Sequence, residues 1–164
     1  MPSLVGSEMC IRDRVGIIQE IRSGSDCCSQ MVSLMTEQGE VNLILSPQTQ
    51  VIGSVRLRRG MRVAGFYDTS LPAPAVFPPQ YQAEIITPLR REQNVTLNYF
   101  DENLVAEDNS LRLNISPMTN VVTANGQRFF CSPGNAELLV YYTITTFSIP
   151  PQTSPQKIVV MCPD

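Results

Sequence analysis

The chain has 164 residues, of which 43% are hydrophobic and 16% are charged, and its formal net charge is −3 at pH 7. This length accommodates one ordinary domain or two small ones, and the charge is too sparse for a disordered or coiled-coil chain. A net negative charge gives no overall attraction to nucleic acid, and no apolar run is long enough to span a membrane.

The first fourteen residues differ from the rest of the chain. Leu4–Arg14 reads LVGSEMCIRDR, which resembles the translation of a sequencing-library adaptor that carries a transposon end. Segments of foreign origin are left out of fold reasoning. We therefore predict that residues 1–14 are a non-native, adaptor-derived segment and that the native N-terminus is missing, in which case the lack of a signal peptide says nothing about the compartment.

From Val15 onward the chain alternates β-prone runs with turn residues, a pattern typical of an all-β fold. Thirteen prolines scattered among these runs suit loops between strands better than helices. In the first half the expected strands are Val15–Ile21, Met31–Thr36, Val41–Leu45, Val51–Leu57, Arg62–Tyr67 and Tyr81–Thr87. Gly39 predicts a hairpin turn between the second and third of them.

The second half repeats this order, and its first expected strands are Val95–Phe100 and Ser110–Ile115. The clearest match pairs VNLILSPQTQVI with LRLNISPMTNVV at an offset of seventy. The residues that recur are Ser46, Pro47, Thr49 and Val51, as Ser116, Pro117, Thr119 and Val121. An apolar strand that stops at Ser-Pro predicts a strand–turn–strand corner, because proline cannot donate to a ladder.

Further along, the repeat requires a change of register. Matching Pro79 and Gln80 with Pro155 and Gln156 gives an offset of seventy-six. This match predicts an insertion of six residues in the second copy, around Asn125–Asn135.

Two copies with about five strands each predict two tandem five-stranded barrel units of the oligonucleotide/oligosaccharide-binding (OB) kind, packed together. The expected units are residues 15–93 and 94–164. Pieces of about seventy residues bury only a marginal core alone. The alternative is therefore a single β-sandwich built from both copies.

The absence of histidine argues against most enzyme chemistry, because it removes the usual general base and the Ser-His and Cys-His nucleophile systems. A carboxylate-dependent hydrolase using Asp101 or Asp108, beside Glu102 and Glu107, is a further alternative, although all four lie among turn residues. The cysteines after the first segment lack the spacing of a metal or redox motif. We therefore predict a protein that is not an enzyme and has no cofactor and no metal site.

Arginines and aromatic residues of the first copy form the candidate ligand site. Neighbours on a strand point to opposite faces, so a pair such as Phe66-Tyr67 is expected to place one ring outward. An outward ring beside arginines offers a stacking platform for a base or a sugar. A solvated rim of arginines and an interface for the rings are the favoured alternatives. The predicted ligand-binding residues are Arg56, Arg58, Arg62, Phe66, Tyr67 and Tyr81.

The cysteines leave the compartment open. Adjacent Cys27-Cys28 in a polar loop could crosslink subunits, and Cys131 could pair with Cys162 in an oxidising compartment. Free thiols in a reducing cytoplasm are favoured over both, so the cytoplasm is slightly favoured over secretion.

The segments VNLILSPQTQVI, GMRVAGFYD, PPQYQAEII and SIPPQTSPQKIVV resemble a group of uncharacterised, duplicated β-proteins of anaerobic Gram-positive bacteria. The likeness runs from about Val15 to Cys162 and implies no established activity. We expect a ligand-binding or interaction protein that forms homo-oligomers and binds a nucleotide, a single-stranded oligonucleotide or a glycan. The alternative is a secreted or surface subunit that assembles through exposed aromatic residues and Cys27-Cys28.

Overall fold

The computed structural model describes residues 11–162, in which all regular secondary structure is β. The strands are β1 (Ile11–Ser23), β2 (Gln30–Thr36), β3 (Gly39–Leu45), β4 (Gln50–Val51), β5 (Arg62–Asp68), β6 (Gln80–Pro88), β7 (Asn94–Phe100), β8 (Arg112–Leu113), β9 (Asn120–Thr123), β10 (Ala136–Tyr142), β11 (Gln152–Thr153) and β12 (Lys157–Met161). They form two compact units, 11–91 and 92–162, and each unit has its own apolar core. The predicted all-β fold of two OB-like units is confirmed.

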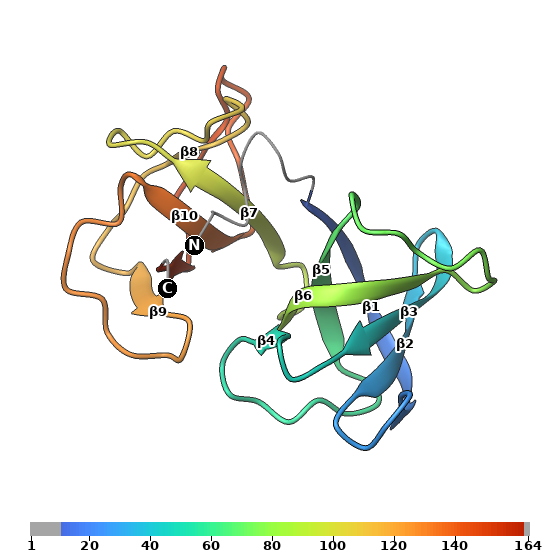
Figure 1. Ribbon diagram of the computed structural model, residues 1–164. Helices are drawn as coiled ribbons and strands as arrows, with labels where there is room; N and C mark the ends of the chain where they lie inside the picture. The colour runs from blue at the N-terminus through green and yellow to red at the C-terminus, as the bar shows by residue number, and fades with distance from the viewer. Residues whose placement is uncertain (1–10, 163–164) are drawn as a thin grey trace. The chain divides into compact units, whose positions relative to one another are not determined.

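The first unit is a closed five-stranded barrel. Its strand order is β3-β2-β1-β5-β6, and β6 closes the barrel by pairing in parallel with β3, where Tyr81 lies opposite Leu43. The long β1 pairs with β5 through its first part and with β2 through its second part (Figure 1). This order, with a parallel closing pair, is that of an OB barrel. Alternate residues of β2 and β3, such as Val32, Leu34 and Val41, point inward and are buried.

The first strand begins inside the segment that the sequence predicts to be adaptor-derived. Residues 1–10 of that segment lie outside the described residues. Ile11–Arg14 pair antiparallel with β5, with Ile11 opposite Asp68 and Arg14 opposite Gly65. The described fold therefore begins four residues before Val15.

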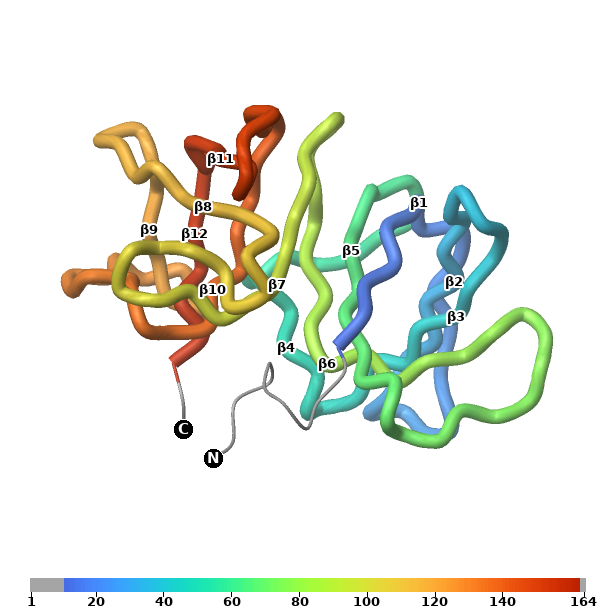
Figure 2. Tube along the Cα trace, turned by 90° about the horizontal axis from the view of Figure 1, so that it is seen from above, coloured from blue at the N-terminus to red at the C-terminus, as the bar shows by residue number. Residues whose placement is uncertain are grey.

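The second unit keeps the same plan, but its second and third strands are reduced to bridges and to the two-residue β8. Its main sheet has the order β7-β10-β12-β9, and β8 pairs in parallel with β11. Two isolated bridges, Phe100 with Ala106 and Val105 with Arg112, stand where the first unit has the ladders of β2. Only ten residues separate Phe100 from Leu111, whereas twenty-two separate Ile18 from Val41, which lie at the matching points of the first barrel. The second copy is therefore an OB-like unit without long second and third strands. Figure 2 follows the backbone of this unit from β7 to β12.

Matching hydrogen bonds establish the register of the repeat at the Ser-Pro corners. The hydroxyl of Thr49 donates to the carbonyl of Ala83 at 2.7 Å, and the hydroxyl of Thr119 donates to that of Pro155 at 2.9 Å. Each threonine hydroxyl also accepts from the backbone N–H of the corner serine three residues earlier. The two threonines are seventy positions apart, so the predicted offset of seventy is confirmed at this corner.

The predicted offset of seventy-six is wrong for the last strand. Ala83 and Pro155 are seventy-two positions apart, and the same spacing separates the cis peptide bonds before Pro78 and Pro150. The sequence match failed because the second copy contains Pro-Gln twice, and the structure aligns Pro79 with Pro151 rather than with Pro155.

Candidate functional site

The outer face of β1, β2 and β3 is a regular surface that has no counterpart in the described part of the second unit. Core residues alternate with outward residues along these strands, so the ladders place outward side chains in rows across the face. One row joins Glu20, Ser33 and Asn42, and the next contains Arg22 and Met31. We call this surface the long-strand face; its outward residues are Ile17, Glu20, Arg22, Met31, Ser33, Met35, Glu40, Asn42 and Ile44.

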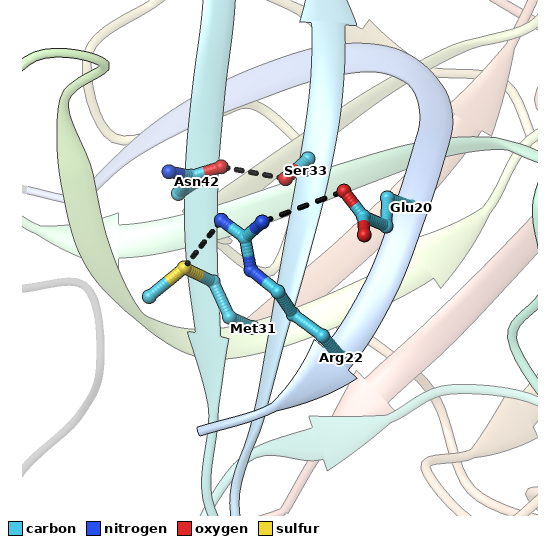
Figure 3. Close-up of polar contacts among 5 residues, drawn as sticks. All are labelled: Glu20, Arg22, Met31, Ser33 and Asn42. Carbon is cyan, nitrogen blue, oxygen red and sulfur yellow. Dashed lines mark hydrogen bonds and ion pairs between the residues drawn. The ribbon is translucent and has the colours of Figure 1, made fainter. Parts of the chain in front are cut away.

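A buried polar pair forms the floor of the long-strand face. The Ser33 hydroxyl donates to the Asn42 Oδ1 at 2.8 Å, and the two residues are only 3% and 4% exposed. Figure 3 shows the Asn42 oxygen turned toward Ser33 and its nitrogen turned away. The hydrogen bond therefore fixes the orientation of the amide and directs its two N–H donors away from Ser33.

Charged side chains form the rim above this floor. Arg22 makes an ion pair with Glu20 at 3.4 Å and donates to the thioether sulfur of Met31 at 3.4 Å (Figure 3). About half of each charged side chain is exposed, 51% for Arg22 and 60% for Glu20. An exposed pair of this kind contributes little to stability, about 0–1 kcal/mol, so both charges remain accessible to a ligand.

A bulge in β1 creates an open hollow beside the rim. The ladder between β1 and β2 shifts between Ile18 and Glu20, which leaves Gln19 as the extra residue. The backbone of Ile18 bonds to Gly60 and Met61, and these bonds hold the loop before β5 against the bulge. Arg59 of that loop then lines a hollow of about 530 Å³ with Gln19, Glu20 and Ile21.

The predicted arginines lie on the loop before β5 and at the start of that strand. Arg56 and Arg58 are exposed in the loop, and Arg62 is half-buried as the first residue of β5. The Arg62 guanidinium donates to the carbonyl of Arg90 at 2.8 Å. The hollow beside the rim is lined by the neighbouring Arg59 rather than by these three arginines.

The predicted aromatic residues lie at the other end of β5 and at the start of β6. Phe66 and Tyr67 are both buried, at 3% and 4% exposure, so neither of them presents an open ring. Tyr67 stacks on Tyr81 with the ring centres 4.0 Å apart, and Arg14 donates to the Tyr67 hydroxyl at 3.3 Å. Because five residues of strand span about 16 Å, the six predicted side chains do not come together in one place.

The candidate carboxylates of the second copy organise turns. Asp101 accepts backbone N–H groups from Asn103 and Val105, at 2.9 and 3.1 Å. Asp108 accepts from the Ser110 backbone and the Asn98 amide, both at 3.0 Å. Partial desolvation raises the pKa of Asp108, but the hydrogen bonds from Ser110 and Asn98 outweigh it, and the net pKa lies below the ordinary value. Both aspartates therefore act as acceptors for neighbouring N–H groups of their turns.

The remaining candidates for chemistry in the described chain are the thiols. Cys27, Cys28, Cys131 and Cys162 are free and exposed. No group of three or more acidic or cysteine side chains in residues 11–162 converges to hold a metal ion. No helix of that part of the chain has the length and hydropathy that crossing a bilayer requires.

Sequence reasoning missed the long-strand face because its residues are far apart along the chain. Glu20, Ser33 and Asn42 meet only through the register of the ladders, whereas the arginine cluster stands out as a local run. One usable signal was Ser33 and Asn42, polar residues within predicted apolar strands. No protein-family model matches the chain, and no curated protein matches it either.

Proposed function

We propose that the protein is a non-enzymatic binding protein and that the long-strand face of the first unit holds an extended, uncharged glycan. OB barrels bind oligonucleotides and oligosaccharides on this face, between the loops after the first and fourth strands. Here these loops are 24–29 and 69–79. The observation that carries the proposal is the fixed amide of Asn42 on the same face as the accessible charges of Glu20 and Arg22.

The chemistry of the face favours a glycan over a nucleotide or an oligonucleotide. Glu20 pairs with Arg22, and Glu40 adds a second carboxylate to the face, so the face offers no positive track for phosphates. No aromatic side chain is among its nine outward residues, and base stacking has no platform there. A sugar hydroxyl both donates and accepts, and it therefore matches a carboxylate, a guanidinium and an amide together.

The change Arg22→Ala is expected to weaken the binding of a neutral oligosaccharide about tenfold, because a hydrogen bond from a charged donor contributes about 1.5 kcal/mol or more. The measurement is titration calorimetry of the full chain with soluble β-linked oligomers of glucose, xylose and N-acetylglucosamine. Arg128→Ala is the matched control, since Arg128 is an exposed arginine of the second unit beside Phe130. Equal affinities of the two variants contradict the proposal, as does tighter binding of single-stranded oligothymidylate than of any sugar.

A second candidate function, a self-assembling subunit, is favoured by the position of Cys27 and Cys28. Both thiols are exposed in the loop 24–29, where the Asp26 carboxylate accepts the backbone N–H of Cys28 at 2.9 Å. Two neighbouring thiols on an exposed turn can form disulfides to other copies. Size-exclusion chromatography with and without reductant tests this function, which predicts a polymer that reductant disperses and Cys27→Ser with Cys28→Ser abolishes.

A further inference from the structure

The two units present matching loops that carry no charge. Loop 69–79 connects β5 with β6, and loop 143–151 connects β10 with β11. Neither loop contains an aspartate, a glutamate, a lysine or an arginine. Each has a large apolar residue directly before a cis proline, Phe77 before Pro78 and Ile149 before Pro150. The feature therefore belongs to the repeat and recurs at the same place in both copies.

Large apolar side chains of both loops are exposed to water. Within the described chain they are Leu71, Val76, Phe77, Ile144, Phe147 and Ile149. Phe147 is fully exposed, and Ile149 is 93% exposed. Exposed apolar side chains gathered on a single loop, as on loop 143–151, mark a surface that contacts an apolar partner. In Figure 1 the orange-red loop 143–151 extends beyond the end of β10.

Several polar groups of loop 143–151 are paired within the loop and its base. Thr146 N–H donates to the Gln152 carbonyl at 2.9 Å, and Gln152 N–H donates to the Thr146 hydroxyl at 3.0 Å. The Ser148 hydroxyl donates to the Pro150 carbonyl at 2.9 Å. Pro150 and Pro151 have no N–H to satisfy. Internal pairing of this kind lowers the cost of moving a loop out of water, because hydrocarbon offers no hydrogen-bond partner.

The size and the charge of the tip separate a lipid surface from a protein partner. Even at about 200 Å² each, Ile144, Phe147 and Ile149 together offer about 600 Å². A stable protein interface needs about 800 Å² from each partner. Insertion into a bilayer surface has no such requirement, and a tip without charge matches a zwitterionic surface.

We propose that loop 143–151 is a lipid contact and that Phe147 and Ile149 insert among the headgroups and upper acyl chains of a zwitterionic bilayer. The burial of these side chains in an apolar layer drives the attachment. The attachment involves no residue of the long-strand face, and it does not depend on glycan binding.

The experiment is sedimentation of the full chain with vesicles of phosphatidylcholine. Wild-type protein is expected to sediment with the vesicles and to stay bound in about 0.5 M NaCl, because salt screens charges and leaves apolar burial intact. The double change Phe147→Ser with Ile149→Ser is expected to lower the partition coefficient by at least about tenfold. Phe130→Ser is the matched control, since Phe130 is a phenylalanine that is 85% exposed in another loop of the same unit.

Three results would overturn the proposal. Equal partition of the double variant and of Phe130→Ser shows that loop 143–151 has no special role in binding. Binding that requires phosphatidylserine and disappears in salt shows an electrostatic contact. A wild-type dimer that the double variant dissociates, without any binding of wild type to vesicles, shows that the loop joins two copies of the chain. Circular dichroism of each variant shows whether the fold is retained. A lower partition coefficient supports the proposal when the spectrum of the variant matches that of the wild type.

Discussion

The change Leu43→Ala is expected to lower the free energy of unfolding of the first unit by about 2–5 kcal/mol. Leu43 lies in the middle of β3, is fully buried and belongs to the core of the barrel. Its side chain fills the space left by Gly65 of β5, where a Cβ would meet the Leu43 Cδ1. Shortening Leu43 leaves a cavity that two rigid strands cannot close, and urea unfolding followed by circular dichroism measures the loss.

The repeat supplies a matched variant for this experiment. Leu113 lies seventy positions after Leu43, is 3% exposed and belongs to the core of the second unit. Leu113→Ala is expected to destabilise that unit by an amount within the same range. Met35→Ala, on the outer face and 48% exposed, is the control and should cost less than about 1 kcal/mol. A cost of Leu43→Ala no greater than that of Met35→Ala contradicts the inward position of Leu43.

The first hairpin shows which parts of the fold can be predicted from the sequence. The expected strands Met31–Thr36 and Val41–Leu45 lie within β2 and β3, because apolar residues alternate on both sides of a turn. Gly39 adopts a φ of 116° at that turn, a conformation that favours glycine. The alternation of apolar residues and the residue types of a turn are local features, so both can be recognised in a single sequence.

The expected strand Val51–Leu57 is a case in which the sequence pattern is misleading. The structure has only Gln50–Val51 as β4. Gly53 and Ser54 follow with φ values of 86° and 50°, and this left-handed backbone turns the chain away from the sheet. The apolar and β-branched residues of this run predict a strand, although Gly53-Ser54 interrupts them. In the structure the left-handed backbone of Gly53 and Ser54 ends the strand.

The candidate site could not be predicted because it depends on register. The bulge at Gln19 changes which residues of β1 face outward, and after it Glu20 points to the same side as Ser33. Without the bulge, the residues of β1 after Ile18 would exchange faces, and Glu20 would point toward the core. Closeness in the sequence instead favoured Arg56, Arg58 and Arg62. The length of β5 separates these arginines from Phe66, Tyr67 and Tyr81 in space.

The difference between the copies places the two proposed activities on different parts of the chain. The second copy lacks long second and third strands, so the long-strand face has no counterpart there. The proline-rich loop is present in both copies, with its apolar residue before the cis proline. The long-strand face is therefore a property of the first unit alone, whereas the uncharged loop is a property of the repeat.

The change Thr49→Val is expected to cost about 1–3 kcal/mol of stability, because it removes two partly buried hydrogen bonds that each contribute about 0.5–1.5 kcal/mol. The Thr49 hydroxyl accepts the Ser46 N–H at 3.0 Å and donates to the Ala83 carbonyl at 2.7 Å, so it ties the corner to β6. Valine has nearly the same shape, and the change therefore isolates the hydroxyl. Thr119→Val removes the same two bonds from the second unit and is expected to cost a similar amount.

Thr49→Ser is the control for this prediction, since serine keeps the hydroxyl and loses only a methyl group. Its cost in urea unfolding should stay below that of Thr49→Val. Equal costs would show that packing of the methyl group, rather than the two hydrogen bonds, holds the corner. The same pair of hydrogen bonds recurs in the second copy, where each partner lies seventy or seventy-two positions later. A parallel result for Thr119→Val would therefore establish that a threonine hydroxyl at this corner positions the last strand in each copy.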